Sequence, residues 1–281
     1  KLFNLLLVSV KEKIIRKANM LSFSANLRYI FSEYSLPDAI RKSSEVGFDA
    51  VECPWPYNTI ASEVGNALME TGLKMLVINT SVGNISTSDK GLAAIPERID
   101  EARTSIDIAF DYAREIDCKN IHVMAGNVPA SEESTKCFKE NLLYAVEKTV
   151  GSDINILIEP LNRRDASGYY LTTIEQAANV ISLTGKKNIK IMFDCYHLQI
   201  NQGDLLQKFE QYRSLIGHVQ FSAIHDRGEP DQGELNYKWL LSKFSQLGYS
   251  GMFGAEYVPR ASNNEHPAEE GLKWLNEFKK S

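Results

Sequence analysis

The stretch Asn155-Ile-Leu-Ile-Glu159 places a short apolar run directly before a carboxylate. The same form returns at Lys190-Ile-Met-Phe-Asp194, His218-Val-Gln-Phe221 and Met252-Phe-Gly-Ala-Glu256. At or near the end of each stretch stands an oxygen-bearing side chain: Glu159, Asp194, Gln220 and Glu256. They are spaced by about one strand-helix repeat, and parallel barrels deliver side chains from the carboxyl ends of successive strands to one shared mouth. The spacing therefore predicts that the four side chains meet.

Apolar runs of strand length alternate with longer segments of helical period along the whole chain. Eight such runs occur, at residues 21–27, 50–53, 74–79, 120–124, 155–159, 190–194, 218–221 and 252–257. Gly47, Gly72 and Gly248 each follow a predicted helix and precede an apolar residue, a form typical of a helix end that leads into a strand. The 281 residues are enough for one barrel of about 250 residues. We expect residues 20–281 to form a single (β/α)8 TIM barrel, with residues 1–19 an extension outside it.

Composition narrows the classes of partner. Lys and Arg total 31 against 36 Asp and Glu, a net charge of -5, so no overall basic field favours nucleic acid. The four cysteines show no CxxC spacing and are too few for a disulfide framework, which indicates a reducing cytoplasm. The apolar run at residues 2–10 is too short to span a bilayer, so we expect no membrane partner.

Three acids and one glutamine would give a cation an oxygen-rich site. Carboxylate and amide oxygens are hard ligands that suit Mg²⁺ or Mn²⁺. Such an ion polarises a carbonyl and its neighbouring hydroxyl and lowers the cost of an enediolate, while a carboxylate moves the proton. Each acid alone could equally be an ordinary residue at the barrel rim. Four on consecutive strands favour an active site.

Longer strings of the chain carry a family resemblance that covers nearly everything after Met20. They are Ser24-Ala-Asn-Leu27, Gly47-Phe-Asp-Ala-Val-Glu52, Pro56-Tyr-Asn58, His122-Val-Met-Ala-Gly126, Asp226-Arg-Gly-Glu-Pro-Asp231, Gly233-Glu-Leu-Asn-Tyr237 and Glu256-Tyr-Val-Pro-Arg260. With these strings in this order, the sequence resembles the hydroxypyruvate isomerase family of xylose-isomerase-like TIM barrels.

The resemblance implies reversible interconversion of hydroxypyruvate and tartronate semialdehyde. It implies that Glu159 and Glu256 are the proton donor and acceptor, and that both hold the metal together with Asp194 and Gln220. Related ketose epimerases usually carry His where Gln220 stands, so Gln favours the hydroxypyruvate isomerase branch. The 2-oxotetronate isomerases share the same fold and residues, and a four-carbon acid is therefore the rival substrate. Barrels of this group often form dimers or tetramers, which makes a homo-oligomer possible here.

A 2-oxo or 2-hydroxy acid substrate also requires a cation for its carboxylate, ideally an arginine with its bidentate fork. Arg227 and Arg260 follow the last two predicted strands. We expect Arg227 to take this role, whereas Arg260 could instead pair with an acid at the rim.

Several other residues near strand ends could support the site. His197 and His122 could hydrogen-bond substrate oxygens or orient an acid, although apolar neighbours leave a structural role equally open for His122. Asn26 lies near the end of the first predicted strand and Glu52 near the end of the second. Each could hydrogen-bond and support residues that contact the substrate. The chain departs from the family pattern at His225, at residues 160–162 and in the first 19 residues.

Two other classes of function use this architecture. DNA-repair barrels of the endonuclease IV type need several zinc ions, held by histidines and acids, and a basic groove; five histidines and a negative net charge speak against that class. A binding protein that has kept the fold without the chemistry is the other alternative. The complete set of acids argues against it.

Overall fold

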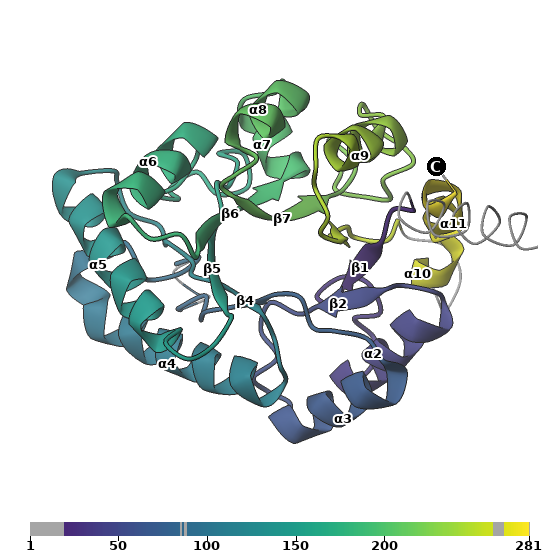
Figure 1. Cartoon of the computed structure of the whole chain (residues 1–281), viewed down its shortest axis with the longest axis horizontal. Coiled ribbons are helices and arrows are strands. Elements are labelled where there is room, and N and C mark those ends of the chain that lie inside the picture. Colours follow the sequence, from purple (N-terminus) through teal and green to yellow (C-terminus); the bar gives the residue numbers. More distant parts are fainter. Residues whose placement is uncertain (1–19, 85, 87–88, 261–266, 281) are drawn as a thin grey trace, which may run out of the picture.

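The computed structural model describes residues 20–84, 86, 89–260 and 267–280. Its eight strands form one sheet in the order β2-β1-β8-β7-β6-β5-β4-β3, with parallel pairing throughout. The strands are β1 (Phe23–Asn26), β2 (Ala50–Glu52), β3 (Ile78–Asn79), β4 (Asn120–His122), β5 (Asn155–Ile158), β6 (Ile189–Asp194), β7 (Ile216–Phe221) and β8 (Phe253–Ala255). They form a ring that the helices surround (Figure 1). The predicted extension, residues 1–19, lies outside the described residues.

Contacts between β2 and the segment before β3 close the ring. Val51 and Met75 form a parallel bridge, and the amide of Leu76 donates to the carbonyl of Val51 at 2.8 Å. The amide of Cys53 donates to the carbonyl of Val77 at 3.2 Å. The predicted (β/α)8 barrel is therefore confirmed, although the run at residues 74–79 is regular strand only at its end.

The helices lie outside the ring, and both kinds of helix end carry recognisable caps. They are α2 (Leu36–Glu45), α3 (Ala61–Thr71), η2 (Pro96–Arg98), α4 (Ile99–Glu115), α5 (Glu132–Lys148), α6 (Ile174–Thr184), α7 (Cys195–Asn201), α8 (Leu205–Tyr212), α9 (Tyr237–Gln246), α10 (Pro267–Glu270) and α11 (Lys273–Lys279). Thr173 caps α6 by accepting from the amide of Gln176 at 3.1 Å. Gly72 ends α3 with φ 70°, a conformation that favours glycine.

The last helix packs against the outer face of the strands where β1, β8 and β7 lie side by side (Figure 1). Trp274 on α11 is fully buried, and its ring meets Phe23 of β1 at 5.3 Å and Phe221 of β7 at 5.6 Å, both edge-on. Such aromatic contacts add about 0.5–1.5 kcal/mol each beyond burial itself. The helix thus bridges the first and seventh strands on the outer face of the barrel. Among the described residues, no helix combines the length and apolar character that crossing a membrane requires.

Candidate active site

The carboxyl ends of β5 to β8 carry the four predicted oxygen-bearing side chains. Glu159 directly follows β5, Asp194 ends β6, Gln220 is the penultimate residue of β7, and Glu256 directly follows β8. Asp194 and Gln220 are partners in the β6–β7 register, and the amide of Glu256 donates to the carbonyl of Phe221 at 3.1 Å. All four residues are buried, at 8% exposure or less. Four polar side chains inside an apolar barrel call for partners or a ligand.

Arg227 connects two of these acids. Its Nη2 lies 2.8 Å from Oε2 of Glu256 and 3.6 Å from Oδ2 of Asp194. The guanidinium carbon lies 5.5 Å from the ring centroid of Tyr29 and 4.9 Å from that of Tyr196, so the group also contacts two aromatic faces. Burial opposes the charge of Arg227, but the carboxylates of Glu256 and Asp194 outweigh burial and raise its pKa. The guanidinium therefore remains charged beside the acids.

Glu159 and Asp194 are acids whose environment favours the protonated form. Burial raises the pKa of Glu159 well above its usual range, and the neighbouring carboxylates of Asp194 and Glu256 add to the shift. Burial also raises the pKa of Asp194, to about 7, against the opposing charge of Arg227. A proton or a cation is needed to relieve two such groups at neutral pH.

His197 presents a hydrogen-bond donor to these acids. Its Nδ1 accepts from the backbone amide of Asn162 at 3.1 Å and from the Asn162 side-chain amide at 2.8 Å. The orientation of that amide is set by Asp165, whose carboxylate accepts from Nδ2 and whose backbone amide donates to Oδ1. The ring proton therefore sits on Nε2, which lies 3.5 Å from Oδ2 of Asp194. Burial, with Arg227 and Lys90 nearby, lowers the pKa of His197 well below its usual value, so the ring is neutral.

His122 lies on the other side of Glu159. Its Nδ1 is 3.6 Å from Oε2 of Glu159, and the residue is 1% exposed. Burial lowers the pKa of His122 to about 3, so the imidazole is neutral. Asn26 reaches the fourth acid, because its Nδ2 donates to Oε1 of Glu256 at 3.2 Å.

Three buried oxygens are suited to a divalent cation. Within the described part of the chain, Oε1 of Glu159, Oδ2 of Asp194 and Oε1 of Gln220 have no hydrogen-bond partner. Glu159, Asp194 and His197 each offer an atom within 4.8 Å of the others. Because His197 carries its proton on Nε2, we assign it as a donor rather than a ligand. The remaining carboxylate and amide oxygens are hard ligands, of the kind that divalent cations take in proteins.

Two of the predicted site residues are engaged by other groups of the protein. Glu52 is buried in the barrel lumen, where its carboxylate accepts from Ser24, His218 and Gln220. Arg260 is held at the rim, with Nε 2.8 Å from Oδ2 of Asp226 and Nη1 2.9 Å from Oε2 of Glu229. Its guanidinium is thus committed to ion pairs, and we leave it out of the proposed substrate contacts.

Other residues around the site were not singled out from the sequence. Asn162 orients His197, Asp165 orients Asn162, and the hydroxyl of Tyr196 donates to Asp165 at 2.9 Å. One signal for Asn162 was available, since it lies three residues after Glu159 in the stretch that departs from the family pattern. The charge of Lys90, in the loop between β3 and η2, helps to lower the pKa of His197, and the position of Lys90 in the sequence gave no sign of this.

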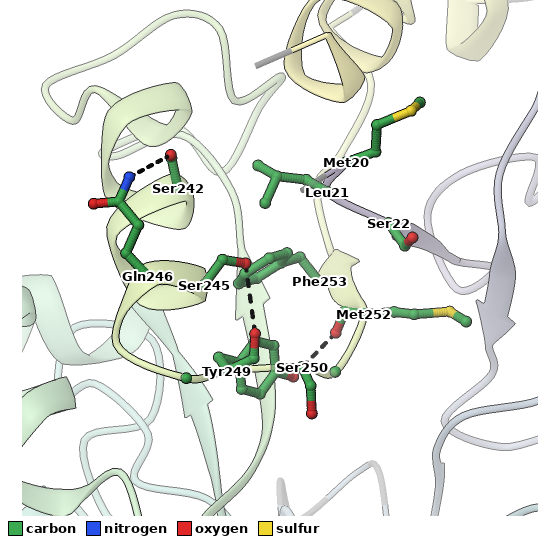
Figure 2. A pocket seen from close by; sticks show the side chains of 12 residues that line it. Met20, Leu21, Ser22, Ser242, Ser245, Gln246, Tyr249, Ser250, Met252 and Phe253 are labelled. Carbon is green, nitrogen blue, oxygen red and sulfur yellow. Dashed lines mark hydrogen bonds between the residues drawn. The ribbon is translucent and has the colours of Figure 1, made fainter. Parts of the chain in front are cut away.

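A cavity of about 640 Å³ lies apart from the site, at the amino ends of β1 and β8 (Figure 2). The carbonyl of Met252, at its wall, accepts from the hydroxyl of Tyr249 at 3.0 Å, and Ser242 accepts from Gln246 at 3.4 Å. None of the described residues that line this cavity is charged. Since barrel enzymes work at the carboxyl ends of the strands, we do not assign the chemistry to it.

The family profile described as xylose isomerase-like TIM barrel matches residues 40–278. The chain belongs to this family. Its relatives include a 2-oxo-tetronate isomerase from Cupriavidus necator, 37% identical over 259 residues, which cover 91% of this chain and 98% of that protein. A hydroxypyruvate isomerase from Escherichia coli is 35% identical over 263 residues, 92% of this chain and 100% of that protein. The resemblance expected from the sequence is confirmed, and these relatives are named as isomerases.

Two solved structures superpose on nearly the whole chain. An AP endonuclease, family 2, from Brucella melitensis has a TM-score of 0.87 at 34% identity and covers 92% of this chain and 99% of its own. A 3-keto-D-glucoside 4-epimerase from Escherichia coli has a TM-score of 0.76 at 23% identity, covering 92% and 99%. The second likeness shows the fold alone.

Proposed function

We propose that this barrel isomerises a small 2-oxo acid by moving a proton between neighbouring carbons, with hydroxypyruvate and tartronate semialdehyde as the pair of substrates. The observation that carries the proposal is the placement of two glutamates, Glu159 after β5 and Glu256 after β8, with Asp194 and Gln220 on the strands between them. Two proton-transfer groups then flank one oxygen-lined position. The rival substrate is a 2-oxotetronate, which differs by one carbon.

Glu159, Asp194, Gln220 and Glu256 would hold the cation, either Mg²⁺ or Mn²⁺. The bound ion would polarise the substrate carbonyl and the adjacent hydroxyl, and so lower the cost of an enediolate. The three unmatched oxygens described above support this ligand set. Oε1 of Glu256 is already engaged by Asn26 and its Oε2 by Arg227, so these two residues would set the angle at which Glu256 meets the ion or the substrate.

The two glutamates divide the proton transfer. In the forward direction, one carboxylate takes the proton from the hydroxymethyl carbon of hydroxypyruvate, and a proton is delivered to the neighbouring carbon, while the hydroxyl proton passes to the former carbonyl oxygen. The raised pKa of Glu159 suits a group that holds a proton near neutral pH. His197, neutral with its proton on Nε2, would donate to a substrate oxygen.

Arg227 would hold the substrate carboxylate. Its guanidinium is about one-fifth exposed and lies between the rings of Tyr29 and Tyr196 beside the acids. A planar fork fixed in this way can bind a carboxylate with two parallel hydrogen bonds. Lys90, half-buried near His197, would add positive charge to the same mouth.

Parallel assays on hydroxypyruvate and a 2-oxotetronate, each with Mn²⁺ and after chelation, test the proposal. We expect turnover of at least one acid, with the three-carbon acid preferred, and loss of turnover in Glu159→Gln and Glu256→Gln. In deuterated water, the hydroxymethyl carbon of hydroxypyruvate should acquire deuterium. A protein that binds the acid and Mn²⁺ without any exchange would be a binding protein, and the proposal would be wrong.

The remaining expectations follow from surface and composition. Four free thiols, at Cys53, Cys118, Cys137 and Cys195, fit a reducing cytoplasm. A net charge of -5 supports a small-molecule substrate over nucleic acid. Tight binding of abasic duplex DNA at physiological salt would instead support an endonuclease, the name that one structural relative carries. Sedimentation would establish whether a homo-oligomer forms.

A further inference from the structure

A buried acid and a buried histidine form a pair inside the barrel, and the acid also contacts Gln220. Glu52 ends β2 and His218 lies on β7, at 1% and 3% exposure. Nε2 of His218 lies 2.9 Å from Oε1 of Glu52, and the hydroxyl of Ser24 donates to the same oxygen. Burial of a carboxylate is unfavourable unless its partners compensate for the lost water. The proton transfer proposed above uses none of these groups.

The other oxygen of Glu52 binds the side chain of Gln220. Nε2 of Gln220 donates to Oε2 of Glu52 at 2.7 Å. An ionised carboxylate only accepts hydrogen bonds, so the nitrogen end of the amide must face Glu52 and the oxygen end must face away. Burial opposes the ionised form, but His218, Ser24 and Gln220 together hold the pKa of Glu52 below its usual value.

We infer that Glu52 is a positioning residue that directs Oε1 of Gln220 toward the cation site and thereby makes Gln220 a ligand. This inference rests on the cation site of the proposed function and extends it. A flipped amide would direct two N–H donors at the cation. Oε1, the atom of Gln220 that can bind a cation, would then face away from the site. Orientation of this one amide therefore decides whether the site has three unmatched oxygens or two.

The glycine on the neighbouring strand is consistent with this arrangement. Gly254 of β8 is the register partner of both Gln220 and Ser24. A Cβ at this position would clash with Oε1 of Glu52 and would lie 2.9 Å from Nε2 of His218 and 3.0 Å from Cγ of Gln220. Only a residue without a side chain leaves room for the carboxylate, the imidazole and the amide to meet.

The binding of Mn²⁺ alone, measured by electron paramagnetic resonance of the free ion, tests the role of Glu52 without any substrate. Glu52→Gln places an amide where Gln220, Ser24 and His218 all donate, so at least one of these donors loses its acceptor. Loss of a partner that orients a ligand typically costs about 10- to 100-fold in metal affinity. We expect Mn²⁺ affinity to fall by this factor in Glu52→Gln, with the barrel still folded by circular dichroism.

Two further variants separate orientation from general destabilisation. Phe244→Leu alters α9 outside the ring, where the Phe244 ring stacks on Phe209 at 4.0 Å, and it should lower the melting temperature without changing Mn²⁺ affinity. The exchange of Glu52→Gln combined with Gln220→Glu reverses donor and acceptor while it keeps the charge. A carboxylate offers oxygen in either orientation, so the exchange should restore most of the affinity lost in Glu52→Gln.

The outcomes are distinct. Unchanged Mn²⁺ affinity in Glu52→Gln, or an equal loss in Phe244→Leu, would overturn the inference. Wild-type protein that binds no Mn²⁺ would overturn it together with the cation site. Mn²⁺ binding that depends on Glu52, in a protein that turns over neither acid, would support the inference and reject the proposed substrates.

Discussion

Acidification should release the cation while the barrel is still folded. Both acids that contribute unmatched oxygens, Glu159 and Asp194, have raised pKa values in the metal-free protein. A proton and a cation then compete for the same carboxylates. We expect the affinity for Mn²⁺ to fall steeply as the pH is lowered from about 7.5 to about 5.5, because Asp194, with a pKa of about 7, becomes protonated in this interval and the raised pKa of Glu159 acts in the same direction.

The pKa of Asp194 sets the minimum size of the effect. With a pKa of about 7, this group passes from mostly ionised to mostly protonated across the interval. Competition from its single proton lowers the affinity about 25-fold between pH 7.5 and pH 5.5, which corresponds to about 2 kcal/mol. Glu159 adds a second proton, and its contribution is at most about 100-fold over the same two pH units. The logarithm of affinity should therefore rise with pH with a slope between about one and about two at the acid end.

Calorimetric titration with Mn²⁺ in two buffers of different ionisation enthalpy measures both the affinity and the number of protons released. We expect at least about one proton per ion at pH 6 and fewer as the pH rises. Circular dichroism at each pH provides the control for folding. Flat affinity across the interval with no proton release would mean that both acids are already ionised without metal, and the reasoning from burial would be refuted.

Three further predictions follow from contacts described above. Chelation of the cation should lower the melting temperature more at about pH 8 than at about pH 6. The reason is that a metal-free protein with a carboxyl whose pKa is raised by folding becomes less stable as the pH rises through that pKa. Scanning calorimetry with and without chelator measures the shift, and equal shifts at the two pH values would count against the prediction. Asn162→Leu removes the side-chain amide that donates to Nδ1 of His197 and so keeps the ring proton on Nε2. This change should lower kcat about tenfold or more with little change in Mn²⁺ affinity, as steady-state kinetics would show. Arg227→Met should lower kcat/KM for carboxylated substrates about 10- to 100-fold, the worth of hydrogen bonds to a charged group, and an uncharged hydroxyketone provides the comparison. An equal loss on both kinds of substrate would assign Arg227 to the acids alone.

The placement of the acids was predictable because it follows from strand periodicity. Apolar runs of strand length mark where strands end, and parallel closure brings those ends to one edge, so Glu159 and Asp194 could be placed before any coordinates were known. The start of β7 was less predictable. Gly217 separates Ile216 from the predicted run, and the strand begins two residues earlier than its apolar pattern indicates.

Contacts across the lumen could not be predicted from the pattern. Glu52 and Gln220 are 168 residues apart and lie on strands that are not neighbours, so neither spacing nor propensity joins them. Arg260 and Arg227 likewise look alike in sequence, since both follow late strands. The loop geometry that turns one toward Asp226 and Glu229 and the other toward Glu256 is a property of the folded chain.

The docking of Trp274 has a consequence for biosynthesis. The indole of Trp274 contacts Phe23 of the first strand and Phe221 of the seventh strand. Because Trp274 lies close to the carboxyl terminus, the outer faces of these strands are covered only after almost every residue has been made. At ribosomal rates of about 5–20 residues per second, synthesis of the chain takes roughly 15 to 60 seconds. Until Trp274 has been made, the Phe23 side chain lacks the indole that covers it in the folded protein. The nascent chain therefore exposes an apolar surface of the kind that chaperones bind.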